Sequence, residues 1–207
     1  MSKVFAGMAA VATVAALGAM AGYAFWPRPT DAFAQCRAGQ SAADIGGPFT
    51  LVDKDGKTVT DADVITAPTL VYFGYTFCPD VCPLDMSLNA EAADILEEEG
   101  QLVNLVFISV DPGRDTPKVV GDFASNIHPR AIGLTGSDEQ VAAAAKAYRA
   151  YFKKQDGDPE FYLVDHSAFT YLVLPGLGFM DFFKHDTPAE QRAQGVRCFL
   201  EAAAQSN

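Results

Sequence analysis

The stretch "YFGYTFCPDVCPLDM", residues 72–86, places two cysteines four positions apart, each followed by a proline, directly after an apolar run. That run begins at Thr69 and is rich in β-branched and aromatic residues, a pattern typical of a central strand buried on both faces. Proline is favoured at the first position of a helix, so a helix is expected from Pro83 to about Glu99. The stretch therefore predicts a buried strand, a proline-bounded turn that carries both cysteines, and a helix.

The chain on either side of this stretch alternates strands with helices. Two short strands flank a turn within residues 49–60, a second buried strand is expected at 103–110, and residues 151–166 look like a mobile hairpin or loop. Alternating elements that end in a hairpin and a helix predict an α/β fold with a mixed β-sheet flanked by helices over residues 45–207. The other expected elements are helices at 116–126, 137–152 and 188–205, a short strand or turn at 131–136, and a hairpin-like pair at 169–174 and 178–183.

Composition limits the classes of protein to which the chain can belong. With 207 residues, 49% of them hydrophobic, the chain has room for one domain with a sizeable core plus an appendage, and it is too apolar to be disordered. The formal net charge of −11 argues against nucleic acid as a partner, because phosphates are bound through Lys and Arg. Four cysteines are too few for a disulfide scaffold and fit better with one functional pair plus two others.

The appendage is the N-terminal segment. Residues 4–26 contain no charged side chain and end in an aromatic cluster, and they exceed the roughly 20 residues that cross a bilayer. Residues 1–27 are therefore expected to form a membrane anchor, and residues 28–44, which lack periodicity, a tether. The alternative is a cleaved signal peptide, because residues 32–34 have the small-x-small pattern of a cleavage site. The length of the apolar stretch favours a retained anchor, since a typical signal core has about 7–15 residues.

The two cysteines of the turn suggest thiolate chemistry. Proline disfavours α geometry for the residue before it, so neither Cys78 nor Cys82 is expected inside a helix. Cys82 should lie at or next to the N-cap of the helix that Pro83 starts, where unpaired N–H groups and the helix dipole lower the pKa of a thiol. The residues leave three uses open: a disulfide, a redox pair, or two ligands of a soft metal such as Cu(I) or zinc. A buried, inert pair is a fourth reading, which this particular placement disfavours.

A metal site would need a third ligand. His166 enters a predicted buried strand, and from the residues alone it is either a ligand or a hydrogen-bonded histidine at the end of a strand. His128 and His185 have polar sequence neighbours and are expected to be solvated. Met86 could supply a thioether but is better explained as a core residue.

Several motifs together resemble the Sco/SenC family of copper proteins. The resemblance covers about residues 45–200, and its motifs occur in the order that the family has. These motifs are "GGPFTLVDKDGKTVTDAD" (46–63), "FGYTFCPDVCP" (73–83), "FISVDPGRDTP" (107–117), "LTGS" (134–137) and "YLVDHSAFTYLV" (162–173).

The resemblance implies a thioredoxin-like fold, one N-terminal transmembrane helix, and a site in which Cys78, Cys82 and His166 bind one copper ion as Cu(I) or Cu(II). It implies a copper chaperone without catalytic turnover that helps deliver copper to the CuA centre of cytochrome c oxidase subunit II. The alternative is a thiol–disulfide reductase that uses the same two thiols to keep the CuA-site cysteines reduced. A peroxide-reducing enzyme is a more distant alternative, because the cysteine loop has no Arg. The extra residue between the thiols, and a histidine where thiol oxidoreductases of this fold have a proline, favour the copper reading.

The resemblance also implies a place and partners. The chain is expected in the bacterial inner membrane as a single-pass protein with its domain in the periplasm, or alternatively in the mitochondrial inner membrane facing the intermembrane space. Besides subunit II, a periplasmic copper donor is an expected partner. In such an oxidising compartment, Cys36 in the tether and Cys198 in the last helix are expected to form a disulfide. Residues 151–166 are expected to move when copper binds.

Overall fold

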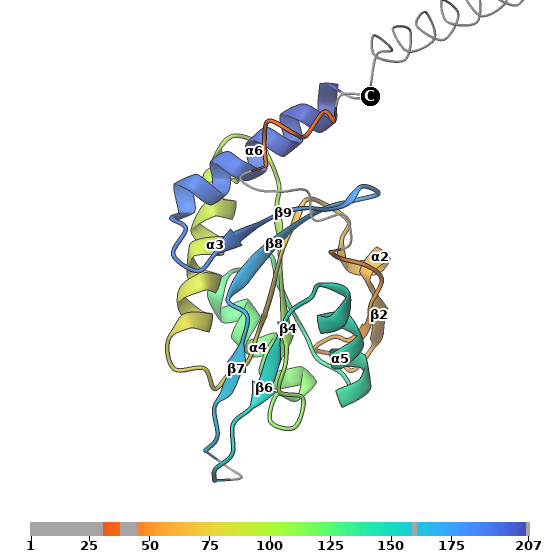
Figure 1. Cartoon of the computed structure of the whole chain (residues 1–207), viewed down its shortest axis with the longest axis vertical. Coiled ribbons are helices and arrows are strands. Elements are labelled where there is room, and N and C mark those ends of the chain that lie inside the picture. The colour runs from red at the N-terminus through yellow and green to blue at the C-terminus, as the bar shows by residue number, and fades with distance from the viewer. Residues whose placement is uncertain (1–30, 38–44, 159–160, 206–207) are drawn as a thin grey trace, which may run out of the picture.

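A computed structural model describes residues 31–37, 45–158 and 161–205 of the chain (Figure 1). The expected anchor, residues 1–27, lies outside these ranges, as does most of the expected tether. No helix within the described ranges is both long enough and apolar enough to cross a membrane.

The described elements follow the predicted alternation of strands and helices. In chain order they are β1 (Thr50–Val52), β2 (Thr58–Thr60), α2 (Asp61–Val64), β3 (Thr69–Gly74), α3 (Val81–Glu98), β4 (Asn104–Ser109), α4 (Pro117–Ile127), β5 (Ala131–Leu134), α5 (Asp138–Ala147), β6 (Phe152–Lys154), β7 (Val164–His166), β8 (Phe169–Leu174), β9 (Gly178–Lys184) and α6 (Ala189–Gln205).

The centre of the molecule is a five-stranded mixed sheet with the order β5-β4-β3-β8-β9. β3 runs parallel to β4, β4 runs parallel to β5, and β8 and β9 are antiparallel to their neighbours. All six residues of β3 are buried, as expected of a strand covered on both faces. The predicted α/β fold with a mixed sheet is therefore confirmed, and its order of elements is that of a thioredoxin-like domain.

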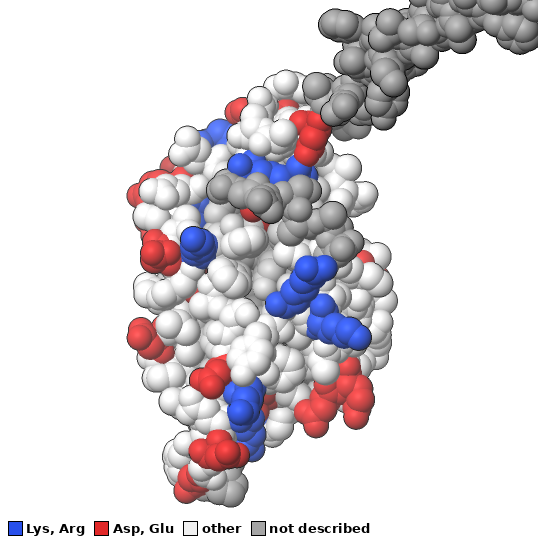
Figure 2. Space-filling model, viewed as in Figure 1, with Lys and Arg blue, Asp and Glu red and all other residues white. Residues whose placement is uncertain are grey.

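Helices form the layers beside this sheet. α3 and α4 connect consecutive parallel strands that follow the same order across the sheet, so right-handed crossovers place both helices on one face. α6 packs against α3, and in Figure 1 α5 lies on the other side of the strands from α3. Local signals start the helices: the hydroxyl of Thr116 accepts the backbone N–H of Val119, and Ser137 forms a capping box with Gln140. On the face shown in Figure 2, acidic and basic side chains are interspersed among uncharged ones.

The start of α3 differs from the prediction. The helix begins at Val81, with Asp80 as its N-cap, so Cys82 lies inside the first turn. The expectation that no cysteine is helical is therefore wrong for Cys82. The first turn tolerates Pro83 because the N–H groups of a first turn have no intrahelical partner to lose.

Residues 151–166 contain a short hairpin, in agreement with one of the two forms expected for this segment. β6 and β7 pair in antiparallel register, with Phe152 opposite His166. His166 is therefore the last residue of a strand, and two residues separate it from the start of β8 at Phe169. The hairpin gives the histidine a fixed backbone position next to the main sheet.

A disulfide joins Cys36 to Cys198 across 162 positions of the sequence, which is the pairing that the sequence analysis expects. The ring of Phe33 stacks on Phe199 beside this bond, with ring centroids 6.0 Å apart. Figure 1 shows residues 31–37 lying along α6. This N-terminal segment is thus attached to the last helix both covalently and by packing.

Candidate metal centre

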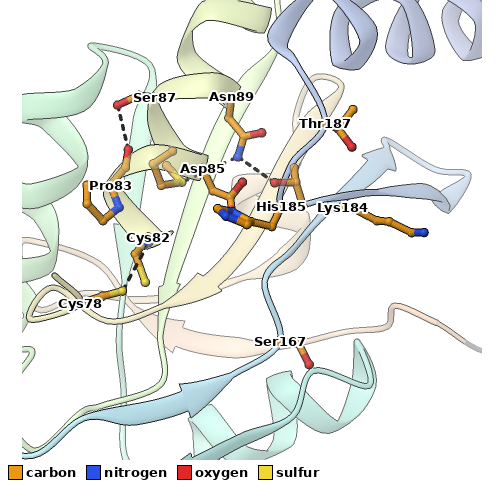
Figure 3. Close-up of polar contacts among 12 residues, drawn as sticks. Cys78, Cys82, Pro83, Asp85, Ser87, Asn89, Ser167, Lys184, His185 and Thr187 are labelled. Carbon is orange, nitrogen blue, oxygen red and sulfur yellow. Dashed lines mark hydrogen bonds and ion pairs between the residues drawn. The ribbon is translucent and has the colours of Figure 1, made fainter. Parts of the chain in front are cut away.

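The loop between β3 and α3 carries one free thiol, that of Cys78, and the first turn of α3 carries a second, that of Cys82. Cys82 is fully buried and Cys78 is 8% exposed. The backbone N–H of Cys82 donates to the Cys78 sulfur at 3.4 Å, as Figure 3 shows. A Cβ on Gly74, at the end of β3, would lie 2.8 Å from the Cys82 sulfur. A residue without a side chain is therefore required where the strand passes the thiol.

His166 faces the Cys82 thiol from the other side. Its Nε2 lies 3.2 Å from the Cys82 Sγ, and its Nδ1 lies 3.2 Å from the carbonyl oxygen of Ser167. Because a carbonyl can only accept, the hydrogen bond to Ser167 assigns the proton to Nδ1 and leaves the Nε2 lone pair directed at the sulfurs. The rings of Tyr72 and Tyr75 contact the imidazole edge-on, with centroids 6.1 Å and 5.8 Å away. The histidine is thus oriented as a metal-binding imidazole is.

These three residues form what we call the metal cluster: Cys78, Cys82 and His166. One donor atom from each lies within 4.8 Å of the other two. The residues come from a loop, from the first turn of α3 and from the end of β7, so only the fold brings them together. Met86 is fully buried in the core, in agreement with its interpretation as a packing residue.

The two thiols differ in their acidity. A hydrogen bond from the Cys82 side chain is the main cause that lowers the pKa of the Cys78 thiol to about 3, against the opposing effect of burial. Burial is the main cause that raises the pKa of the Cys82 thiol, and the adjacent Cys78 sulfur adds to it. The expectation that the helix start acidifies Cys82 is therefore wrong. The N–H at the start of α3 points to the Cys78 sulfur and stabilises negative charge there instead.

A second group of potential ligands, Asp94, Glu97 and His128, also meets within 4.8 Å. His128 is buried, so the expectation that it is solvated is wrong. Its Nδ1 accepts the backbone N–H of Arg130 at 3.1 Å, so Nε2 carries the proton and donates to Asp94 at 3.1 Å. This tautomer is the opposite of that of His166. It serves a hydrogen bond at the end of a helix and leaves no lone pair for a metal.

Sequence reasoning missed two buried polar features beside the metal cluster. The first is the hydroxyl of Tyr72, which is buried and has no hydrogen-bond partner within the described ranges. A tyrosine in the middle of an otherwise apolar strand was the available signal. The second is a buried network that we call the arginine cluster: Asp85, Asn89, Thr170, His185 and Arg192.

Arg192 is the centre of the arginine cluster and is fully buried. Its guanidinium donates to Asp85 Oδ1 at 2.7 Å, to Asn89 Oδ1 at 2.6 Å and to the Thr170 hydroxyl at 3.1 Å. It also donates to three backbone carbonyls at the junction of β9 and α6. His185, which is 40% exposed, places Nδ1 3.1 Å from Asp85 Oδ2, so it is only partly solvated. Figure 3 shows Asp85 and Asn89 on α3 beyond the cysteines, with His185, from the segment after β9, next to Asp85.

The fold and the site define a thioredoxin-like domain with a candidate centre of two thiols and one imidazole. The chain belongs to the SCO1/SenC family, whose model matches residues 37–201. Protein SenC of Rhodobacter capsulatus is 53% identical over 97% of this chain and 92% of its own length. The mitochondrial SCO1 homolog 1 of Arabidopsis thaliana is 43% identical over 77% of this chain, and the match spans 47% of that protein.

Solved structures share the fold. Arabidopsis thaliana ScoI with copper bound has a TM-score of 0.72 and 42% identity over 76% of this chain and 99% of its own. BsSco, a member of the Sco family of cytochrome c oxidase assembly proteins in which a disulfide switch has been identified, has a TM-score of 0.61. It is 26% identical over 77% of this chain and 95% of its own.

Proposed function

We propose that this protein is a membrane-anchored copper chaperone that binds one copper ion through Cys78, Cys82 and His166. The proposal extends to delivery of this ion to the CuA centre of cytochrome c oxidase subunit II. The observation that carries it is the convergence of the two sulfurs and the imidazole Nε2 within 4.8 Å. Family membership and the copper-bound relative support the choice of copper over other soft metals.

The residues of the metal cluster suit copper as a transient cargo. Soft thiolates favour Cu(I), and an imidazole suits copper in either oxidation state. The Ser167 carbonyl fixes the imidazole tautomer in the way that outer partners commonly fix a metal-binding histidine. Two sulfurs and one nitrogen leave a coordination position open to a ligand from an acceptor protein. Transfer would then proceed by stepwise exchange of ligands, with no free ion.

The anchor and the compartment belong to the same proposal. The apolar segment 4–26 would hold the domain at the bacterial inner membrane, with the domain and a copper donor in the periplasm. The disulfide between Cys36 and Cys198 supports an oxidising compartment, because such bonds persist outside the cytosol. Among the described residues, the free thiols are those of the metal cluster.

The test is a copper titration of the purified full-length protein, followed by absorption spectroscopy. One ion per chain and sulfur-to-copper charge-transfer bands are expected. Replacing both Cys78 and Cys82 by Ser should abolish the bands. A protein that binds no copper, or that keeps its bands in the double variant, would contradict the proposal.

A second candidate function is thiol–disulfide reduction of the CuA-site cysteines. The low pKa of the Cys78 thiol favours it, because a thiolate is the attacking species in disulfide exchange. The variant His166→Ala separates the two functions. A chaperone should lose more copper affinity than the about 10–100-fold that loss of an outer-shell partner costs. A reductase should keep most of its activity toward a disulfide-bonded CuA domain, because both thiols remain.

A further inference from the structure

The hydroxyl of Tyr72 is a donor without an acceptor. The side chain is fully buried in β3, and its oxygen has no hydrogen-bond partner within the described part of the chain. A buried polar group in this state costs free energy, so a native protein that keeps one usually has a use for it. Phenylalanine would fill the same space in an otherwise apolar strand without this cost.

The ring of Tyr72 lies directly behind the metal cluster. A Cβ built on Gly74 would be 2.8 Å from the Cys82 sulfur and 2.9 Å from Cε1 of Tyr72, so the sulfur and the ring border the same small space. The ring also meets the imidazole of His166 edge-on, at 6.1 Å between centroids. Two of the three members of the metal cluster therefore contact or adjoin this tyrosine.

The nearby carboxylate of Asp85 is already in use. Its Oδ1 accepts a hydrogen bond from Arg192 at 2.7 Å, and its Oδ2 faces the Nδ1 of His185 at 3.1 Å. A phenol keeps its proton at neutral pH, so the Tyr72 hydroxyl has a proton to donate. The adjacent acceptor that gains negative charge when the site is loaded is the Cys82 sulfur.

We propose that the Tyr72 hydroxyl donates a hydrogen bond to the Cys82 sulfur once that sulfur is a metal-bound thiolate, and so tunes the centre. This inference rests on the proposed copper site. Tyr72 is a positioning residue, because it acts through Cys82 and does not itself bind the ion. A hydrogen bond to a ligand sulfur withdraws electron density from it, and such bonds tune the redox potential of copper–thiolate sites.

The variant Tyr72→Phe removes one oxygen and keeps the ring. Copper stoichiometry should stay at one ion per chain, while copper affinity falls by about 10-fold, the lower end of the range for an outer-shell partner. The sulfur-to-copper charge-transfer band should move to longer wavelength and the Cu(II)/Cu(I) potential should fall, because the sulfur becomes a better electron donor. The readouts are the spectrum and the potential of the loaded full-length protein.

Thermal unfolding provides a readout that a purely structural tyrosine would not give. Without copper, Tyr72→Phe should melt at the same temperature as the native protein or higher, because an unpaired buried hydroxyl is gone. With copper, the rise in melting temperature on loading should be smaller in the variant. A tyrosine that only packs the core would change the metal-free and loaded forms alike, and that result would overturn the inference.

Tyr75→Phe is the matched control. Tyr75 is buried and meets the imidazole of His166 in the same edge-on way, but its hydroxyl lies near the backbone of Val164. The variant Tyr75→Phe should not change the wavelength of the sulfur-to-copper charge-transfer band. An equal shift in both variants would assign the effect to the surroundings of the histidine and overturn the inference. If the native protein itself gave no copper–sulfur band, the proposed function would fail; a native band that Tyr72→Phe leaves unchanged would reject the Tyr72 inference alone.

Discussion

Two polar clusters lie side by side along the start of α3, and they differ in how completely their hydrogen bonds are satisfied. In the arginine cluster, Arg192 is fully buried and its three guanidinium nitrogens all donate to side-chain or backbone oxygens. In the metal cluster, two free thiols and an imidazole lone pair face one another, and behind them lies the hydroxyl of Tyr72, which has no hydrogen-bond partner in the described part of the chain. Cys82 and Asp85, one from each cluster, are three residues apart on the same helix.

This difference suggests different roles: the arginine cluster stabilises the fold, and the metal cluster is the candidate binding site. A buried charge persists only where its partners are complete, so the arginine cluster fixes how α3, β8 and α6 pack. A buried polar group without a partner costs stability, and the metal cluster has one beside it, the hydroxyl of Tyr72, which has no hydrogen-bond partner among the described residues. The two sulfurs and the imidazole nitrogen are the soft donors that the proposed copper ion requires.

The largest expected effect comes from removing the charge that completes the arginine cluster. Arg192→Met leaves the carboxylate of Asp85 buried without its main partner and should lower the free energy of unfolding by about 3–5 kcal/mol. Urea unfolding of the metal-free protein measures it. The double variant Asp85→Leu, Arg192→Met should regain most of the loss, because no charge is then left unpaired.

The matched control is Arg197→Met on the same helix. Arg197 pairs with Glu99 at the surface, and both side chains are substantially exposed, so the change should be small. If Arg192→Met left the free energy of unfolding unchanged but abolished copper binding, the arginine cluster would support the metal cluster and would not stabilise the fold. That result would contradict the difference described between the two clusters.

A smaller but distinct loss is expected on removing the disulfide. Replacing Cys36 and Cys198 together by Ser should lower the free energy of unfolding by about 2–4 kcal/mol, since the bond restricts the unfolded chain. Copper stoichiometry and the charge-transfer spectrum should not change, because the bond joins α6 to residues 31–37 and not to the metal cluster. Loss of the copper spectrum in this variant would show that stability and binding are not separable as described.

The smallest effect on copper binding is expected from a substitution in the second group of potential ligands, Asp94, Glu97 and His128. Asp94→Ala removes an exposed carboxylate that accepts from His128, so copper stoichiometry should stay at one ion per chain. Titration beside the native protein measures this. A drop in stoichiometry would mean that the tautomer assigned to His128 does not prevent it from binding metal.

Local signals in the sequence predicted most of the fold. The apolar run from Thr69 marked a buried strand, the prolines marked the start of a helix to within two residues, and the serine and threonine caps marked two more helices. The metal cluster was harder, because only the resemblance to a family favoured His166 over an ordinary histidine at a strand end. His166 and the thiol of Cys82 are separated by 84 positions in the sequence, a separation that no local pattern bridges.

The arginine cluster could not be predicted from local pattern at all. Arg192 sits in a polar helical stretch where an arginine is ordinarily solvated, and its partner Asp85 is 107 positions away. The acidity of the cysteines was mispredicted for a related reason. The three-dimensional turn places the Cys82 side chain and the Cys82 N–H against the Cys78 sulfur, so the pKa is lowered at Cys78 and not at Cys82.

The disulfide between Cys36 and Cys198 also determines the end of the domain at which the N-terminal segment is attached. Figure 1 shows residues 31–37 along α6 at one end of the domain, whereas the start of α3 lies toward the other end. A membrane anchor ahead of residue 31 would therefore attach the domain at its α6 end and turn the metal cluster away from the lipid. Without this disulfide, only packing would hold residues 31–37 to α6, and the orientation of the domain relative to such an anchor would be less restricted.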